Sequence, residues 1–269
     1  MLNSISFTSI YKPLKKNVLQ SKLLKDCNFS NLVYTTKKDT FTKTVIKSDA
    51  EKYINSLREK IRPDNIIGEG TEAKVYALSD DYVIRVLKYQ KQSSNQKFTS
   101  IPELFEGQNF GQAVMVSNDG AISINKLVTG KQMYPVERIS SDTYLNSLRN
   151  YSELSDTCLE RYVKDFSYLN KKGYKMDPNP ENFLYDAKKD RIGFVDIAKL
   201  EDKIINYDEP FSHTAVMFPL VNGRQVFRQY MQMYPSERKE MFDLINKIEE
   251  RILPYCEKYD IPKAKWDSK

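Results

Sequence analysis

The side chains best suited to chemistry lie between residues 174 and 196 of this 269-residue sequence. Asp177 is followed five positions later by Asn182, and a second short β-prone run leads into Asp196. Carboxylate and amide groups of this kind can accept a proton or bind a hard divalent cation. A turn at residues 186–190 separates the two β-prone runs, so the sequence predicts a hairpin that places two acids and one amide. The competing interpretation is an ordinary Pro/Asn/Asp turn between a helix and a hairpin.

A helix is predicted just before these residues, over 155–171, because its apolar side chains recur with helical spacing. Gly173 follows and can end the helix. We expect the apolar stripe to be buried, so that the helix presents the acidic loop at its C-terminal end. The stripe consists of Leu159, Tyr162, Val163, Phe166 and Leu169.

A pair of glycines, Gly68 and Gly70, lies between two other β-prone runs. Glycine lets the backbone approach a phosphate closely, and successive N–H groups can point at the anion. The next predicted strand, 82–87, carries Arg85 on the face opposite its two β-branched neighbours, and Lys88 has the opposite parity. A plain hairpin is the competing interpretation of the glycine pair.

Charge and cysteine content exclude several classes of protein. The net charge is +6, but residues 1–60 hold twelve Lys/Arg against five Asp/Glu, a net charge of +7, which leaves −1 for the remainder. This asymmetry argues against a core that binds nucleic acid. The three cysteines are far apart, and His213 is the only histidine, so a zinc site is not expected and the thiols fit reduced residues of an intracellular protein.

The first 47 residues are basic, rich in Ser, Asn and Thr, and lack a helical or alternating period. We expect residues 1–47 to form a disordered or loosely ordered secretion or targeting leader. They lack the apolar core of a Sec signal peptide, and no apolar run is long enough to span a membrane. A first helix is predicted from Ser48, with Glu51 completing a capping box.

The segment 177–182, Asp-Pro-Asn-Pro-Glu-Asn, closely resembles the Asp-Leu-Lys-Pro-Glu-Asn of the protein-kinase catalytic loop. Four kinase-like motifs occur in kinase order over residues 64–200. Among kinases, the chain is most similar to the compact type III secretion effector kinases of pathogenic bacteria, the OspG and NleH type. The similarity includes the segment Glu103-Leu104-Phe105, the pair Phe110-Gly111 and a hinge exit that contains glycine.

The resemblance implies a role for each matching residue. The phosphates would be covered by Gly68, Gly70, Ala73 and Val75, with Ala73 in place of the third glycine of the family's loop. Arg85 would anchor the phosphates, and Glu103, or alternatively Glu106, would brace Arg85. Leu127 would lie at the hinge that meets the adenine, Asp177 would be the catalytic base, and Asn182 and Asp196 would be the Mg²⁺ ligands. For either glutamate the alternative is an ordinary acid in the first turn of a helix.

The implied fold is α+β and bilobal, with a small β-rich N-lobe and a reduced, mainly helical C-lobe. We expect the leader at 1–47, the N-lobe with its preceding helix at 48–130, and the C-lobe at 131–269. The implied function is that of an atypical Ser/Thr protein kinase, a monomer that uses ATP and Mg²⁺. It would be secreted by a bacterium into the host cytosol and would meet a host protein as substrate or activator.

Departures from the kinase pattern keep two alternatives open. Lys175-Met176 replaces the usual His-Arg, Asn179 replaces the catalytic-loop Lys, Ala198 replaces the Gly after the metal-binding Asp, and Arg85 replaces Lys. One alternative is a pseudokinase that binds a host protein without phosphoryl transfer. The other is a kinase-fold enzyme that acts on a small molecule.

Overall fold

The computed structural model forms two compact units, which are described separately. Unit 1 comprises Met1–Gly107 and Gly111–Leu127, and unit 2 comprises Gln108–Phe110 and Val128–Lys269. The expected leader 1–47, most of the expected helix from Ser48, and the site candidates Gly70, Glu103 and Glu106 lie outside the described residues. The residues that the structure describes are 57, 61, 63–69, 73–78, 82–88, 109–111, 113–116, 121–134, 139–199 and 211–264.

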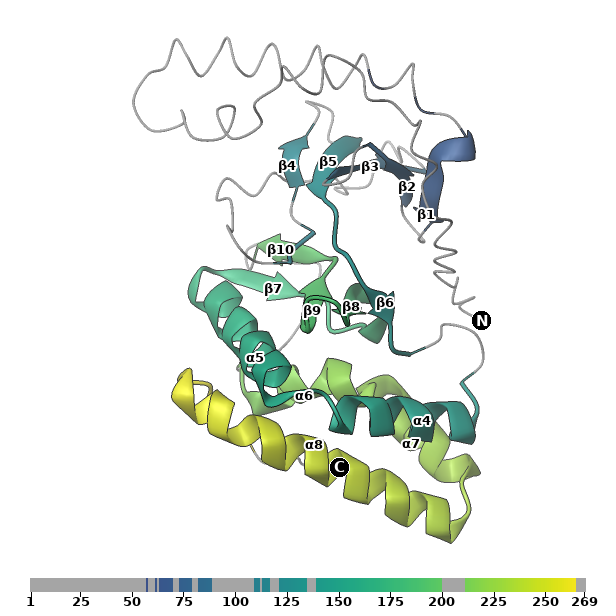
Figure 1. Cartoon of the computed structure of the whole chain (residues 1–269), viewed down its shortest axis with the longest axis vertical. Helices are drawn as coiled ribbons and strands as arrows, with labels where there is room; N and C mark the ends of the chain where they lie inside the picture. The colour runs from purple at the N-terminus through teal and green to yellow at the C-terminus, as the bar shows by residue number, and fades with distance from the viewer. Residues whose placement is uncertain are drawn as a thin grey trace, which may run out of the picture. The chain divides into compact units, whose positions relative to one another are not determined.

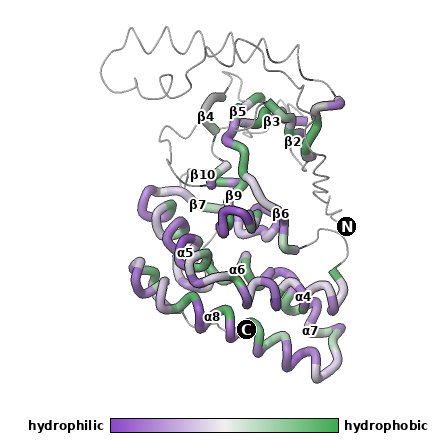
Figure 2. Tube along the Cα trace, in the orientation of Figure 1, coloured by the Kyte–Doolittle hydropathy of each residue, from purple (hydrophilic) through white to green (hydrophobic). Residues whose placement is uncertain are grey.

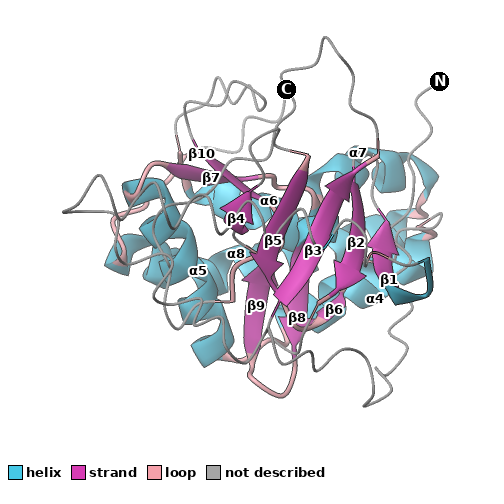
Figure 3. Cartoon of the chain, turned by 90° about the horizontal axis from the view of Figure 1, so that it is seen from above, coloured by secondary structure: helices cyan, strands magenta, loops and turns pink. Residues whose placement is uncertain are grey.

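Unit 1 contains a five-stranded antiparallel sheet in the order β1-β2-β3-β5-β4. A short 3-10 turn, η2 (Pro63–Asn65), precedes it. Figure 3 shows β1, β2, β3 and β5 side by side. The strands are β1 (Ile66–Glu69), β2 (Ala73–Ala77), β3 (Tyr82–Leu87), β4 (Ala113–Val116) and β5 (Ile122–Lys126).

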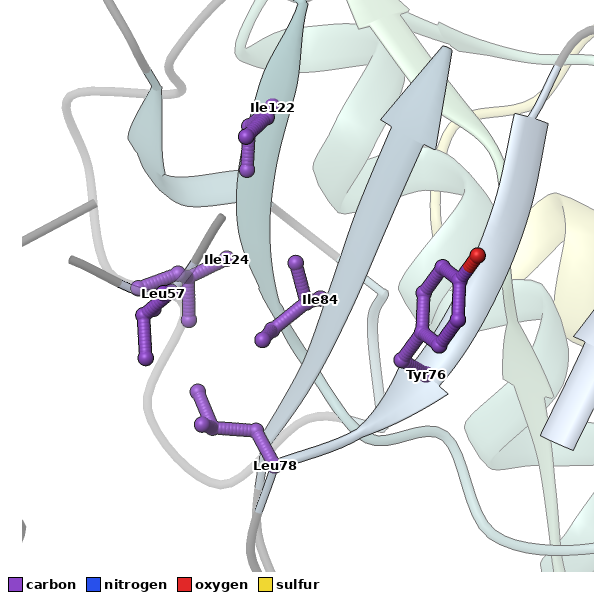
Figure 4. Packing of buried hydrophobic residues seen from close by; sticks show 6 residues of the cluster. All are labelled: Leu57, Tyr76, Leu78, Ile84, Ile122 and Ile124. Atoms are coloured by element: carbon purple, nitrogen blue, oxygen red, sulfur yellow. The ribbon is translucent and has the colours of Figure 1, made fainter. Parts of the chain in front are cut away.

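One face of this sheet carries the apolar core of unit 1. The register places Tyr76 opposite Ile84 and Ile84 opposite Ile124, so alternate residues of three strands gather on the same face. Figure 4 shows Ile84 and Ile124 beside Leu57 and Leu78, with the ring of Tyr76 lying along β2. The buried members are Leu57, Tyr76, Leu78, Ile84, Ile122 and Ile124.

Unit 2 holds the helices shown in Figure 1. The predicted apolar stripe of residues 155–171 is confirmed: it forms α5 and its five members are buried. Serine side chains cap the starts of α4 and α5, since Ser140 and Ser155 accept hydrogen bonds from N–H groups of the first turn. The helices are α4 (Ser141–Ser152), α5 (Asp156–Lys171), α6 (His213–Val221), α7 (Gly223–Gln232) and α8 (Pro235–Lys258).

The longest helix, α8, packs along α4 and α5. Its hydropathy alternates along the tube in Figure 2, as expected for a helix with one buried side. The buried residues are spaced three or four positions apart and are Met241, Ile245, Ile248, Ile252 and Cys256. None of the helices in the described part of the chain is long and apolar enough to cross a membrane.

Three buried tyrosines attach α6 to the rest of unit 2. The hydroxyl of Tyr134 donates to the Leu220 carbonyl at 2.8 Å, and that of Tyr144 donates to the Val221 carbonyl at 2.6 Å. A third hydroxyl, from Tyr162 on α5, donates to the backbone of the same helix. The bonds to Leu220 and Val221 satisfy backbone acceptors at the end of α6, where helical carbonyls lack intrahelical partners.

Short strands complete unit 2 and form two small antiparallel sheets. The predicted hairpin is confirmed, because β8 pairs with β9 across the turn at residues 187–190. The described residues therefore have a mixed α+β fold, as the sequence predicts. The strands are β6 (Lys131–Gln132), β7 (Tyr174–Met176), β8 (Phe183–Asp186), β9 (Arg191–Phe194) and β10 (Ile197–Lys199), and a 3-10 turn, η3 (Pro180–Asn182), precedes β8.

Candidate functional site

Two acids of unit 2 are brought together by the pairing of β7 with β10. Met176, the last residue of β7, lies opposite Ile197, the first residue of β10. Asp177 follows Met176 and Asp196 precedes Ile197, so the two acids are the next residues at the same end of this antiparallel pair. Both side chains are half-buried. Two acids separated by 18 residues in the chain thus converge at one strand end.

The second strand pair brings Asn182 to the same place. Phe183 lies opposite Phe194 in the β8–β9 hairpin, and beyond this pair the Val195 N–H donates to the Asn182 carbonyl at 2.8 Å. The Asn182 side chain also contacts the start of the loop, because its Nδ2 donates to the Asp177 carbonyl at 3.4 Å. One stretch of backbone, 194–197, leaves the β8–β9 hairpin and enters the β7–β10 pair. Asn182 is therefore connected through this backbone to the strand ends that carry Asp177 and Asp196.

The loop from Asp177 to Asn182 is fixed by its own polar groups. The Asn179 N–H donates to Oδ1 of Asp177 at 3.0 Å, and the Asn182 N–H donates to the Asn179 carbonyl at 2.8 Å. Gln132 holds the middle of the loop, since its Nε2 donates to the Glu181 carbonyl at 2.9 Å. Pro180 limits the backbone further. The loop therefore holds its side chains in a defined arrangement.

An aromatic cluster lies beneath the hairpin. Phe183 and Phe194 meet edge to face with ring centres 5.2 Å apart, and Phe166 of α5 lies 5.3 Å from Phe194. Phe110 stacks on Phe194 from the other side at 5.3 Å. These rings are buried and attach the end of the hairpin to α5. The sequence identified the α5 stripe but gave no signal that Phe110 joins it.

The ionisation of Glu181, in this loop, is shifted. Its burial raises the pKa of the carboxyl above the usual range, and the negative charge of Asp177 acts in the same direction. Hydrogen bonding from Asn179 and the positive charge of Arg224 oppose the shift of this pKa. Arg224 belongs to α7, so the positive charge of a residue distant in sequence contributes to the electrostatic potential at the loop. The sequence did not single out Glu181 or Arg224.

In unit 1, three of the predicted phosphate-contacting residues form one row across the sheet. Gly68 lies opposite Val75, and Val75 lies opposite Arg85. Ala73 is two residues from Val75 and therefore shares its face. Leu127 follows β5 and is half-buried. The structure thus gathers Gly68, Ala73, Val75 and Arg85 on one face of the sheet.

The other face of the same sheet holds Lys74 and Lys88. Lys88 forms an ion pair with Glu69, with 2.6 Å between Nζ and Oε1, and this bond lowers the pKa of the Glu69 carboxyl. Both residues line a shallow pocket together with Lys74 and Tyr76. Register places this pocket on the face opposite Arg85, as the parity of the predicted strand required.

The chemistry of the unit 2 trio is that of an oxygen-donor site. Two carboxylates and one amide carbonyl suit a hard cation such as Mg²⁺, which binds few protein oxygens and retains water. In the part of the chain that the structure describes, no cluster of three or more His, Cys, Asp or Glu residues could hold a metal by itself. A cation held by Asn182 and Asp196 would thus need further oxygen ligands, such as water or a phosphate.

His213 lies apart from this trio and is fully buried at the start of α6. Its Nδ1 accepts from the Ala264 N–H at 2.9 Å, and its Nε2 lies 2.8 Å from Oε1 of Glu249. The first bond requires an unprotonated Nδ1, so Nε2 carries the proton and donates it to Glu249. The side chain therefore has a structural role, attaching the C-terminal segment to α6 and α8.

The chain was compared with models of known protein families and with curated proteins, and neither comparison found a match.

Proposed function

We propose that this protein binds ATP with Mg²⁺ and transfers the γ-phosphate to a Ser or Thr hydroxyl of another protein, within a bilobal kinase-like fold. The observation that carries the proposal is the meeting of Asp177, Asn182 and Asp196 at the ends of two strand pairs. Phosphoryl transfer needs a base for the attacking hydroxyl and oxygen ligands for the metal, and these residue types supply both.

Each residue of the trio has a distinct task in this proposal. Asp177 takes the proton of the attacking hydroxyl, and its carboxylate is already oriented by the Asn179 N–H. Asn182 and Asp196 would hold Mg²⁺, which neutralises charge on the phosphates when it is bound. The bond from the Val195 N–H to the Asn182 carbonyl fixes the backbone between these two ligands. The half-burial of all three side chains keeps them accessible to a substrate.

Unit 1 would supply the phosphate contacts. Gly68 and Ala73 have small side chains, so the backbone at these positions can approach a phosphate closely. Arg85 occupies the third strand of its sheet, which is where protein kinases carry their phosphate-binding Lys. A guanidinium can bind a carboxylate and a phosphate oxygen at once through its fork of donors. Gly70 and Glu103 would complete this set, as the resemblance implies.

The setting of this activity is also part of the proposal. The basic leader and the likeness to type III effectors support delivery into the host cytosol, where a host protein would be the substrate or the activator. Charge supports a protein rather than a nucleic acid as partner, because the chain beyond residue 60 is close to neutral.

One observation favours a second candidate, a pseudokinase that captures a host protein. Asn179 stands where kinases place a Lys, and its side-chain oxygen accepts from the Glu181 N–H at 3.5 Å. The side chain therefore adds no positive charge for the γ-phosphate. Such a charge is a large contribution to transition-state stabilisation, on the order of 3 kcal/mol.

The test is transfer of ³²P from γ-labelled ATP to the protein itself and to casein, with and without Mg²⁺. Wild type should transfer phosphate only with Mg²⁺, and Asp177→Asn should reduce the rate at least about 100-fold. Asp243→Asn, which makes the same change at an exposed position of α8, is the matched control and should have no effect. ATP binding without transfer by wild type would favour the pseudokinase, and hydrolysis without transfer to protein would favour a small-molecule acceptor.

A further inference from the structure

Helix α7 buries a glutamine side chain and exposes two large apolar side chains on its outer side. Gln229 is buried, and its Nε2 donates to the Ile139 carbonyl at 2.8 Å. On the outer side, Phe227 is 73% exposed and Met231 is 62% exposed. Placing a large apolar side chain in water while burying an amide is unfavourable for the isolated domain. The arrangement therefore points to a partner that covers the outer side.

The exposed side chains form one continuous stripe. Arg224, Phe227, Arg228 and Met231 follow the spacing i, i+3, i+4, i+7, which places them on one helical face. Tyr234 follows in the turn between α7 and α8 and is 75% exposed. We call these five residues the α7 face. Together with Phe242, its three apolar members are the exposed large hydrophobic residues of the described chain.

A second aromatic layer supports the α7 face from α8. The ring of Tyr230 meets that of Phe242 edge to face at 5.9 Å, and the Arg238 guanidinium lies 4.6 Å from the centre of the Tyr230 ring. Arg238 is itself fixed, since its Nε donates to the Met233 carbonyl at 3.0 Å. The aromatic side chains at the edge of the face are thus held in place before any partner arrives, which lowers the entropic cost of binding.

The charge of the α7 face selects the kind of partner. Helix α7 contains two arginines and no acidic residue. From residue 222 to 239 there are four Lys/Arg residues and one Glu, and the carboxylate of that Glu237 accepts from the Tyr234 N–H. A partner complementary to this surface therefore carries carboxylates beside an apolar or aromatic side chain.

The placement of the arginines also decides between a protein and a membrane. A helix that lies in a lipid interface carries its cations on the side away from the acyl chains. Here Arg224 and Arg228 alternate with Phe227 and Met231 on the same face, so insertion of the apolar side chains would draw guanidinium groups into the hydrocarbon. Aromatic residues, Met and Arg are the types enriched at protein interfaces, where Lys is depleted.

We propose that the α7 face is a docking surface for an acidic protein segment that presents aromatic or large aliphatic side chains. Phe227, Met231 and Tyr234 form its apolar centre, and Arg224 and Arg228 bind carboxylates of the segment. This docking needs neither ATP nor Mg²⁺, so it stands apart from the phosphoryl-transfer proposal.

The experiment measures binding of fluorescein-labelled poly(Glu,Tyr) and poly(Glu) to the full chain by fluorescence anisotropy at about 0.15 M salt. A basic segment elsewhere in the chain would bind both polymers alike, so the preference for the tyrosine-containing polymer reports the apolar centre. Wild type should bind poly(Glu,Tyr) at least about ten-fold more tightly than poly(Glu). The double variant Phe227→Ser/Met231→Ser should lose this preference, and its melting temperature should confirm that it is folded.

Charge reversal tests the arginines separately. Arg228→Glu should weaken binding of poly(Glu,Tyr) at least about five-fold more than Lys188→Glu, which makes the same charge change in the exposed turn between β8 and β9. Hydrogen exchange of the wild type should show protection of residues 224–234 by the copolymer.

The proposal is overturned if wild type binds both polymers equally, or if the variants of the α7 face bind as wild type does. Binding to phosphatidylserine vesicles that depends on Phe227, without any preference between the polymers, would assign the face to a membrane instead. A dimer in sedimentation equilibrium that Phe227→Ser dissociates would assign the face to a second copy of the chain.

Discussion

At the scale of single residues, Asp177 has two separable roles. Its Oδ1 accepts from the Asn179 N–H, which orders the loop, and its carboxylate is the proposed base. Asparagine retains an Oδ1 acceptor but cannot take up a proton at neutral pH, whereas alanine removes both functions.

We therefore predict different effects of the two substitutions. Asp177→Asn should leave the free energy of unfolding within about 0.5 kcal/mol of wild type, while Asp177→Ala should lower it by about 1 kcal/mol because the loop bond is lost. Both should reduce the rate of phosphoryl transfer at least about 100-fold. Urea unfolding beside the ³²P assay checks this. Equal stability of the two variants would show that the loop bond does not contribute.

Two buried thiols predict how stability depends on pH. Burial raises the pKa of Cys158 and of Cys256 to about 12, from an ordinary value near 9. The unfolded chain therefore loses these protons at lower pH than the folded chain does. Stability is complete below about pH 9 and decreases above it, by at most about 1.4 kcal/mol per pH unit for each thiol.

Urea unfolding at pH 8, 9 and 10 measures this slope before most tyrosines of the unfolded chain ionise. Cys256→Ala should reduce the slope, whatever its effect on stability at pH 8 from lost packing. An unchanged slope in this variant would exclude the thiol as its source.

At the scale of elements, the tyrosine bonds predict the cost of loosening α6. Tyr144→Phe removes the donor to the buried Val221 carbonyl and should lower the free energy of unfolding by about 1–3 kcal/mol. Tyr255→Phe is a suitable control, because it makes the same change at a half-buried tyrosine of α8. A Tyr144→Phe protein as stable as the control would mean that water replaces the lost donor.

Close packing of β9 predicts a sensitive glycine. A Cβ at Gly193 would overlap the side chains of Asn109 and Val128. Gly193→Ala should therefore destabilise unit 2 by about 1–3 kcal/mol through overpacking. The double variant Gly193→Ala/Asn109→Ala should be more stable than the sum of the two single effects predicts, and simple additivity in thermal unfolding would show that the overlap is relieved elsewhere.

Local patterns in the sequence predicted those elements whose signals lie within one short segment. The α5 stripe repeats with helical spacing, and a turn separates the two strands of the hairpin. The alternation of side chains along 82–87 places Arg85 on the face opposite to that of Lys88. The pairing of β7 with β10 was not predicted, because each strand has three residues and the partners are about 20 positions apart. The contribution of Phe110 to the aromatic cluster is long-range for the same reason.

The α7 face could not be predicted from the sequence either, but the reason is not long-range pairing. The residues of α7 have helical spacing, but spacing alone does not show which side is buried. An apolar stripe on a helix is normally assigned to the core, and here the buried position is Gln229. Only the packing of α7 against α4 and α6 shows that Phe227 and Met231 lie on its exposed side.

At the scale of the whole molecule, the proposed function centres on the trio of Asp177, Asn182 and Asp196. Unit 1 carries a cation and two small residues on one sheet face, and unit 2 carries the acids and the amide at two strand ends. In the proposed function, the first group would contact the phosphates of ATP and the second would hold its Mg²⁺. Binding of that ligand is therefore the step on which every part of the proposed function depends.

The measurement that tests this most directly is isothermal titration calorimetry of ATP into the full chain, with and without Mg²⁺. The account predicts binding with Mg²⁺ that weakens at least about ten-fold in Asp196→Asn, while Asp243→Asn binds as wild type. Absence of Mg²⁺-dependent ATP binding by the folded wild-type protein, or binding by Asp196→Asn as tight as by wild type, would contradict it.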